Sequence, residues 1–266
     1  MQTSEARIIA IAMQKGGVGK TTTTAHLARA ACRRGLTVLV IDLDQQGNAT
    51  SLLARESIGA TDIGIADVII PNADLDITEV IVPGKWSGLW VAPGVTDPLK
   101  NAAYVLEQHG DGAEYRVAEA LSPARESYDL ILIDTPPALN VITINALTAA
   151  DALLTVAQGD GFSADGLAEL RRTVRKVRQY HNPELAWAGV LVNLWRGTLS
   201  EQAWVKDMED SFTDAAVWPE RIPNWTEVKE SLDHGRGLDQ GRARFKRLAQ
   251  HYETMIDRLM SDDPWR

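Results

Sequence analysis

The sequence predicts an α/β protein with a doubly wound, mostly parallel sheet flanked by helices. Short apolar runs without polar alternation recur along the 266-residue chain, as expected for strands that are covered on both faces. Segments with apolar residues at helical spacing separate these runs, and this alternation is typical of β-α-β units. A glycine-rich stretch joins the first apolar run to the first helical segment, which is where such units bind anions.

The predicted elements follow in order along the chain. The first strand covers residues 7–12, and the helix of residues 19–34 follows it, with Gly35 at the position of a C-cap. The other strands are predicted at residues 37–41, 89–92, 130–133, 153–156 and 189–192. The other helices are predicted at residues 98–107, 114–121, 163–180, 200–212 and 241–260. Residues 57–112 are rich in prolines and glycines and should form loops and short elements, so residues 1–266 are expected to form one domain.

Composition indicates a globular protein with an acidic balance. Hydrophobic residues make up 45% of the chain, charged residues make up 24%, and the net charge is -9. This balance argues against a protein coated in positive charge, but a local basic patch can still attract nucleic acid. The single cysteine, Cys32, excludes an internal disulfide or a zinc cluster of cysteines. Without a signal-peptide pattern at the N-terminus or a long apolar span, we expect a cytoplasmic protein.

Residues 14–21 nearly match the phosphate-binding pattern G-x-x-x-x-G-K-[ST]. The backbone of Gly16, Gly17, Val18 and Gly19 is predicted to form a nest of N–H groups for an anion, at the N-terminus of a helix. Lys20 should reach the terminal phosphates and the Thr21 hydroxyl should ligate Mg²⁺, with Thr22 following on the same helix. Position 14 holds Gln in place of the first glycine, and Lys15 adds a second cation to the loop.

Three aspartates at strand ends are predicted to face this loop. Asp134 ends an apolar strand before Pro136 and Pro137, and it is expected to hold Mg²⁺ through water. Asp42 and Asp44 lie two residues apart on an extended segment and therefore share a face. In an open parallel sheet, ligands lie at the carboxyl ends of the strands, where such carboxylates can orient water or metal.

Three segments together resemble the ParA group of partition ATPases. They are KGGVGKTT at residues 15–22, DLDQQGNAT at residues 42–50 and DLILIDTPPALNVITINAL at residues 129–147. The resemblance extends from about Arg7 to at least His234. It implies the deviant Walker subclass of P-loop NTPases, with ATP and Mg²⁺ as cofactors and ATP-sandwich homodimers with nucleotide at the interface.

The resemblance also implies roles for individual residues. Lys15 would cross to the phosphates bound by the partner subunit, while Lys20 would serve its own nucleotide. Thr21 would ligate Mg²⁺, Asp44 would position the attacking water, and Asp42 would support the magnesium cluster. Lys15, Lys20 and Asp44 are therefore the predicted catalytic residues.

Adenine recognition is predicted at Asn193 and Pro223. Asn193 ends the strand GVLVN, where related ATPases place an adenine-reading amide, although a strand-end Asn can equally cap a turn. Pro223 lies where the family's Ile-Pro segment lines the base. The sequence departs from the family at Gln45, which replaces a proline, and at Glu227, which stands where a DNA-binding arginine is expected.

Two basic clusters are candidates for DNA binding, and the alternative for both is a solvated helix face. Spacings of three and four residues place Arg171, Arg175 and Arg178 on one helix face. The candidates are Arg171, Arg175, Arg178, Arg196, Arg242, Arg244, Lys246 and Arg247. A few phosphate contacts per subunit would give weak, salt-sensitive binding without sequence preference. We therefore expect this protein to associate with the nucleoid. Sequence-specific binding to an operator is not expected, because the sequence shows no helix-turn-helix before the loop.

Three function classes therefore compete. The first is a ParA-type ATPase that moves a plasmid, a chromosome origin or a protein assembly, with hydrolysis stimulated by a cargo-adaptor or ParB-like partner. The second is a MinD-like membrane switch, but the acidic end SDDPWR would be repelled by anionic lipid, so no membrane is expected. The third is an ATP-dependent metabolic enzyme of the same fold.

Overall fold

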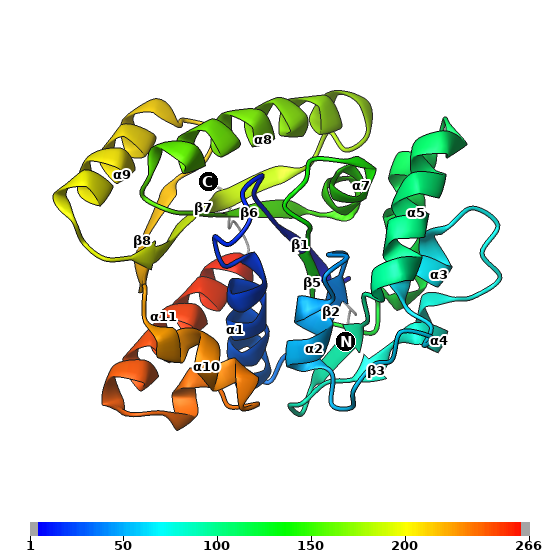
Figure 1. The fold of residues 1–266 in the computed structure, drawn as a ribbon, viewed down its shortest axis with the longest axis horizontal. Helices are drawn as coiled ribbons and strands as arrows, with labels where there is room; N and C mark the ends of the chain where they lie inside the picture. Colours follow the sequence, from blue (N-terminus) through cyan, green and yellow to red (C-terminus); the bar gives the residue numbers. More distant parts are fainter. Residues whose placement is uncertain (1–4, 262–266) are drawn as a thin grey trace.

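The computed structural model describes residues 5–261 and builds them around one eight-stranded sheet (Figure 1). The strand order is β3-β4-β2-β5-β1-β6-β7-β8. Every neighbouring pair is parallel except β3 with β4. The doubly wound, mostly parallel α/β fold is thereby confirmed. Residues 1–4 and 262–266, which carry part of the predictions on a signal peptide and on the acidic C-terminus, lie outside the described residues.

The strands and helices have the following bounds. The strands are β1 (Arg7–Ala12), β2 (Val38–Asp42), β3 (Val82–Pro83), β4 (Leu89–Ala92), β5 (Leu130–Asp134), β6 (Ala152–Ala157), β7 (Ala186–Trp195) and β8 (Val217–Pro223). The helices are α1 (Lys20–Arg33), α2 (Asn48–Leu53), α3 (Ile65–Ile69), α4 (Ile77–Val80), α5 (Thr96–His109), α6 (Arg116–Leu121), α7 (Val141–Ala149), α8 (Gly161–Tyr180), α9 (Leu199–Ser211), α10 (Thr226–Asp233) and α11 (Ala243–Leu259). Short 3₁₀ turns cover Ala113–Tyr115, Ser122–Ala124 and Leu238–Gln240.

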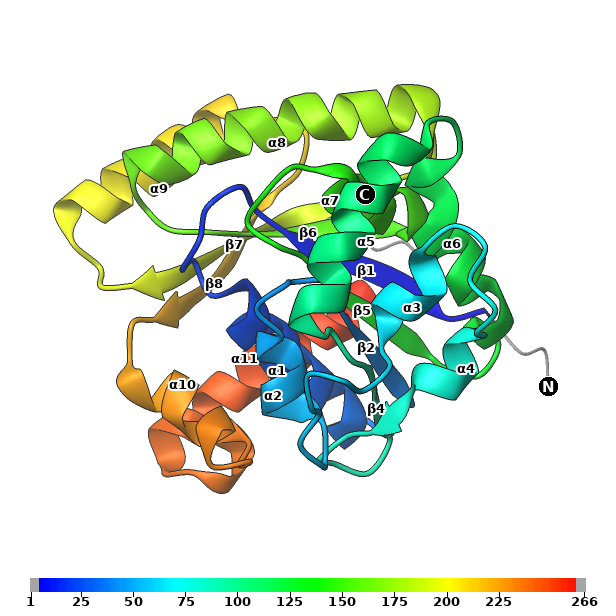
Figure 2. The same cartoon turned by 45° about the vertical axis from the view of Figure 1, so that its right-hand side comes forward.

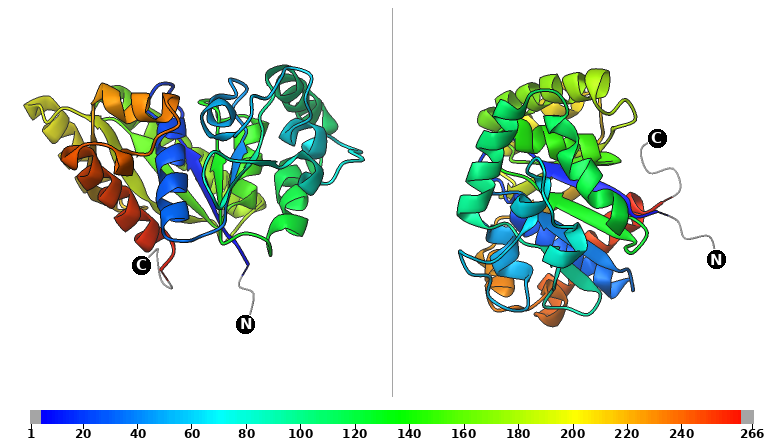
Figure 3. Two further views of the ribbon diagram at one scale, coloured as in Figure 1. Left: turned by 90° about the horizontal axis from the view of Figure 1, so that it is seen from below. Right: turned by 90° about the vertical axis from the view of Figure 1, so that its right-hand side faces the viewer.

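Helices cover both faces of the sheet (Figures 1 and 3). On one face α1 packs against α2, α10 and α11, and on the other α7 packs against α5, α6 and α8. In Figures 1 and 2, α9 lies beside the N-terminal end of α8. The strands β2, β5 and β6 are buried at every position, which explains their uninterrupted apolar sequences. Burial of these apolar side chains supplies the main driving force for folding.

The register of the central strands brings their carboxyl ends to one edge. Ile11 of β1 and Asp42 of β2 both lie opposite Asp134 of β5. The loops that follow β1, β2 and β5 therefore meet at the same place. This arrangement puts the glycine-rich loop and two predicted acidic residues within reach of one another.

Several elements were absent from the sequence prediction, and each has a physical reason. The edge strand β8 contains Pro219, Glu220 and Arg221, because one of its sides has no neighbouring strand to exclude polar residues. Helix α7 is apolar nearly all round, so helical periodicity does not reveal it. Its N-cap is Asn140, whose side chain accepts the Thr143 amide. In the region 57–112 the short elements α3, α4 and β3 were not predicted, whereas β4 and α5 match the strand predicted at residues 89–92 and the helix predicted at residues 98–107.

His26 joins three helices in the layer that contains α1. Its Nε2 donates to the Val228 carbonyl of α10 at 2.8 Å, and its ring lies 5.0 Å from the Tyr252 ring of α11. Burial lowers the pKa of His26 to about 4, although the hydrogen bond to Val228 and the charge of Asp239 act in the opposite direction. The imidazole is therefore neutral in the folded protein at neutral pH.

The His26→Gln variant should weaken the pH dependence of stability. Between pH 6.5 and about 4 the unfolded chain binds a proton on this histidine that the folded chain does not, so wild-type stability falls as pH falls. The full window corresponds to about 3 kcal/mol, at ~1.4 kcal/mol for each pH unit. Urea unfolding at several pH values measures the slope. The exposed His109→Gln variant is the control, and an identical slope in His26→Gln and wild type would contradict the assignment.

Candidate phosphate-binding site

The loop between β1 and α1 has the backbone geometry of an anion cradle. Gly17 and Gly19 have φ values of +73° and +91°, in the left-handed region that favours glycine. A Cβ at Gly19 would lie 2.1 Å from Nδ2 of Asn193, whereas nothing lies within 4 Å of one at Gly17. Val18 is fully buried and anchors the loop in the core. The first amides of the 14-residue helix α1 have no helical partners, so the site fits a bound phosphate.

Lys20, Thr21 and Asp134 meet at the start of α1. The Thr21 hydroxyl donates to Asp134 at 2.7 Å, and the Thr24 hydroxyl donates to the other carboxylate oxygen at 3.1 Å. Lys20 is only 6% exposed. Burial lowers the pKa of Lys20, while the carboxylates of Asp134 and Asp44 act in the opposite direction. A buried cation beside two carboxylates fits a site in which phosphate and metal charges balance one another.

Asp42 fastens the segment that follows β2. Its carboxylate accepts the Thr50 amide at 2.7 Å and the Thr50 hydroxyl at 2.8 Å, and it accepts the Asp44 amide at 3.2 Å. Asp44 is 9% exposed and accepts the Gln46 amide at 3.0 Å. Burial raises the pKa of Asp42, and the neighbouring Asp134 raises it further. Asp42 therefore shapes the loop that carries Asp44, and Thr50 is a partner that the sequence prediction missed.

Lys15 contacts the segment after β6. Its ammonium group donates to Asp160 at 2.6 Å and to Gln158 at 3.2 Å. Gln158 and Asp160 were absent from the sequence prediction. Polar residues directly after a fully buried strand are the signal that could have found them.

Asn193 supports the loop through its amide group. Its Nδ2 donates to the Val18 carbonyl at 2.7 Å, and the side chain is 3% exposed. Pro223 ends β8 at the same edge of the sheet, and Leu194 has a φ of +55°. A polar cavity of about 150 Å³ lies beside them, lined by Gln158, Gly159, Asp160, Leu194, Arg196, Glu201 and Asn224. The asparagine thus links β7 to the glycine loop.

The basic residues predicted on α8 are divided by the structure. Arg171 pairs with Asp214 and lies 5.9 Å from the centre of the Phe212 ring, and Arg178 donates to the Leu185 carbonyl at 2.7 Å. Both are partly buried, while Arg175 is exposed. The three arginines therefore do not form one equally accessible face.

The basic residues in the last third of the chain are more accessible. Arg196 pairs with Glu201 at 3.0 Å, and Arg244 pairs with Glu227 at 2.5 Å while lying over the Trp225 ring. Three further side chains are exposed at the start of α11, namely Arg242, Lys246 and Arg247. The first turn of this helix contains no acidic residue.

The described part of the chain contains neither a cluster of metal-ligating side chains nor a helix suited to span a membrane. Among the side chains that the structure describes, no group of three or more His, Cys, Asp or Glu residues is placed to hold a metal ion. Over the same residues, no helix combines the length and the apolar character that crossing a membrane would require.

A Gly19→Ala substitution should destabilise the protein, whereas Gly16→Ala should not. The new methyl group at Gly19 would clash with Asn193 and would strain a left-handed backbone, at a cost of about 1–3 kcal/mol. The nearest atom to a Cβ at Gly16 is 4.0 Å away, on Pro137, so a change within about 0.5 kcal/mol is expected. Urea unfolding of the two variants measures the difference. Equal stabilities would contradict the close approach of Asn193 to this loop.

Sequence comparison relates the chain to proteins of chromosome partitioning. A family model described as AAA domain matches residues 6–187. The chromosome partitioning protein ParA of Caulobacter vibrioides is 38% identical over 242 residues, which cover 89% of this chain and 87% of that protein. The sporulation initiation inhibitor protein Soj of Bacillus subtilis is 36% identical over 234 residues, which cover 87% of this chain and 90% of that protein.

Structural comparison gives the same fold. A McdA–ATP complex from Cyanothece superposes with a TM-score of 0.86 at 23% identity, covering 97% of each chain. Cobyrinic acid a,c-diamide synthase from Mycobacterium smegmatis, with bound ATP analog and magnesium, superposes with a TM-score of 0.81 at 29% identity. That match covers 96% of this chain and 94% of the synthase. From the sequence matches over most of its length, the chain belongs to the family of ParA-type partition ATPases.

Proposed function

We propose that this protein is an ATPase that dimerises on binding ATP and Mg²⁺, binds nucleoid DNA without sequence preference and positions a cargo. A cargo-adaptor or ParB-like partner would stimulate hydrolysis. The observation that carries the proposal is the glycine loop with two lysines, Lys15 and Lys20, in a chain 38% identical to a chromosome partitioning protein. The cargo can be a plasmid, a chromosome origin or a protein assembly.

ATP and Mg²⁺ fit the residues at the site. The loop amides and Lys20 would hold the phosphates, and the Thr21 hydroxyl would ligate the metal. Asp134 accepts the Thr21 hydroxyl, and this contact supports a role for Asp134 in holding magnesium-bound water. Asp42 would support the metal cluster by fixing the loop of Asp44. Mg²⁺ commonly takes only one or two ligands from protein and the rest from phosphate and water, in line with this sparse donor set.

The nucleotide supplies the phosphoryl bond that is hydrolysed, and the protein supplies position and charge. Asp44 lies on the loop after β2, where it would orient the attacking water. Lys20 would neutralise charge from within its own subunit. Lys15 would do so across a two-fold interface, because two triphosphates that face each other need added positive charge.

Base recognition is proposed at the polar cavity beside Asn193 and Pro223. The Asn193 amide nitrogen is bonded to the loop, which leaves its carbonyl oxygen as the group that can accept from an adenine. Pro223 would offer an apolar contact to the base. The buried Asn193 side chain would then contact both the base and the phosphate loop, and base binding would be coupled to the conformation of that loop.

DNA binding is proposed mainly at the start of α11. The N-terminus of this helix exposes Arg242, Lys246 and Arg247. Positive side chains there are disfavoured by the helix dipole, and a phosphate bound between them would stabilise their charges. Arg196 and Arg244 would add to this surface, while Arg171 and Arg178 have internal partners and Arg175 lies on α8, on the other face of the sheet. A dimer doubles the number of phosphate contacts, which would give association with the nucleoid in an otherwise acidic protein.

An ATP-dependent synthase is the second candidate, and the 29% identity to cobyrinic acid a,c-diamide synthase favours it. The ParA and Soj relatives are more similar in sequence, at 38% and 36% identity. A measurement of ATP turnover separates the two functions. Stimulation by a small carboxylic acid with an amide donor, rather than by DNA or a partner protein, would support the synthase.

Lys20→Ala and Lys15→Ala should have different consequences. Lys20→Ala should abolish ATP binding, because its buried side chain stands at the start of α1, directly after the glycine loop. Lys15→Ala should leave ATP binding to the monomer largely intact and should prevent ATP-dependent dimerisation. Fluorescent-nucleotide titration and size exclusion with light scattering measure the two properties. A Lys15→Ala protein that dimerises as well as the wild type would contradict the inter-subunit role.

Combined replacement of Arg242, Lys246 and Arg247 by Ala should weaken ATP-dependent DNA binding at least tenfold. Each lost phosphate contact lowers the slope of log affinity against log salt by about 0.9. Fluorescence anisotropy with ATP, ADP or no nucleotide, across a salt series, measures affinity and slope. The control variant replaces the α8 residues Arg172, Arg175 and Lys176 by Ala. A larger loss in that variant would move the DNA surface to α8, and absence of ATP-dependent binding at low salt would contradict DNA binding itself.

A further inference from the structure

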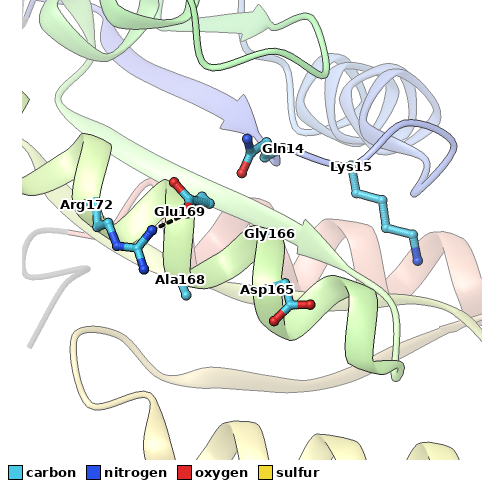
Figure 4. Close-up of a pocket in the computed structure, with 7 residues that line it drawn as sticks. All are labelled: Gln14, Lys15, Asp165, Gly166, Ala168, Glu169 and Arg172. Atoms are coloured by element: carbon cyan, nitrogen blue, oxygen red, sulfur yellow. Dashed lines mark hydrogen bonds and ion pairs between the residues drawn. The ribbon is translucent and has the colours of Figure 1, made fainter.

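The Lys15 side chain binds polar groups of its own subunit, in the turn between β6 and α8. Its ammonium group lies 2.6 Å from Asp160 and 3.2 Å from Gln158. Figure 4 shows Lys15 extending from the loop toward the N-terminal end of α8. The two charged side chains are partly shielded, with exposed fractions of 25% for Lys15 and 37% for Asp160. This contact differs from the contact with a partner's phosphates that the proposed function requires.

The turn that binds Lys15 is held in place because its residues also form hydrogen bonds at the start of α8. Asp160 is the N-cap of this helix and accepts the Ser163 amide at 2.8 Å. The Ser163 hydroxyl in turn accepts the Gln158 amide at 3.1 Å. Hydrogen bonds from Lys15 and Ser163 hold the pKa of Asp160 below its ordinary value despite partial burial. Asp160 is therefore a charged, fixed partner for Lys15.

Lys15 also has space to leave this position. A cavity of about 450 Å³ adjoins it, and α8 contributes most of the wall. The residues that line the cavity are Gln14, Lys15, Asp165, Gly166, Ala168, Glu169 and Arg172. Movement of the lysine side chain therefore requires the loss of polar contacts to Gln158 and Asp160, without repacking of the core.

We propose that Asp160 is a positioning residue that holds Lys15 in its own subunit and so competes with assembly of the dimer. The inference rests on the proposed function, in which Lys15 serves the partner's nucleotide. One ammonium group cannot bind Asp160 and reach another subunit at the same time. Each dimer must therefore break this ion pair twice. The contact raises the threshold for assembly and keeps nucleotide-free subunits apart.

The expected size of the effect follows from the exposure of the pair. Partly exposed ion pairs typically change an equilibrium by about 2- to 5-fold. Because the pair breaks in both subunits, its removal should strengthen the dimer by roughly tenfold. The residual hydrogen bond to Gln158 remains in both proteins that are compared.

Asp160→Asn is the decisive variant because Asn is as good an N-cap as Asp but lacks the charge. We expect its ATP-bound dimer to half-dissociate at a protein concentration roughly tenfold lower than wild type, measured by light scattering with a non-hydrolysable ATP analogue. Asp165→Asn removes an equal charge one turn further along α8 and should leave this concentration unchanged. Asp160→Ser, which also keeps a cap, gives a second test if Asp160→Asn folds poorly.

A second readout addresses Lys15 itself. In the nucleotide-free monomer, acetic anhydride should modify Lys15 several-fold faster in Asp160→Asn than in wild type, as measured by peptide mass spectrometry. A purely structural role of Asp160 in α8 would not change this rate. The Lys85 modification rate in the same digest provides an internal reference.

The outcomes separate the two proposals. An Asp160→Asn dimer that is equal to or weaker than wild type, or an unchanged Lys15 modification rate, would overturn the role of Asp160. A wild-type protein that stays monomeric with ATP would overturn the proposed dimer and, with it, the competition. A dimer that depends on Lys15 and is tightened by Asp160→Asn but not by Asp165→Asn would support both.

Discussion

The placement of two buried carboxylates opposite each other, one of them beside a buried lysine, is the constraint on which the site depends. Parallel register sets Asp42 opposite Asp134, so both would repel each other in a nonpolar environment if they were left alone. Thr50 donates a hydrogen bond to Asp42. Asp134 accepts hydrogen bonds from Thr21 and Thr24, and Lys20 supplies the opposite charge. Such an arrangement is costly for stability alone, because a buried ionic cluster repays its desolvation only with good geometry. A ligand that brings both anionic phosphate and a metal cation explains why it is maintained.

Sequence predicted the parts of this arrangement that local rules determine. The apolar runs of β1, β2, β5 and β6 are continuous because helices cover both faces, and the glycines of the loop are required by left-handed backbone. The acidic strand ends could be grouped because parallel strands share an edge. Strand β8 and helix α10 could not be placed in this way. Their sequences carry polar residues or short patterns, and their positions depend on packing against α1, α11 and β7.

The contacts of individual side chains could not be predicted from local sequence rules. Asn193 was expected to read a base or to cap a turn, whereas its amide holds the Val18 carbonyl of a loop 175 residues earlier. Lys15 was expected to face a partner subunit, and in the monomer it faces Asp160, 145 residues away. Arg171 and Arg178 share a helical spacing with Arg175 but have partners from later segments. Each of these contacts joins residues that are distant in sequence, so spacing alone carries no information about them.

The two lysines of the loop therefore differ in environment as well as in position. Lys20 is buried among carboxylates of its own subunit, and the role proposed for it needs no movement. Lys15 is attached to an adjacent helix cap by a contact at the surface, where exchange between partners is inexpensive. In the proposed dimer Lys15 would leave one subunit to complete another, and it would then need a resting partner of moderate strength, because a buried pair would be too costly to break. Asp160, partly exposed and fixed by α8, has the properties of such a partner.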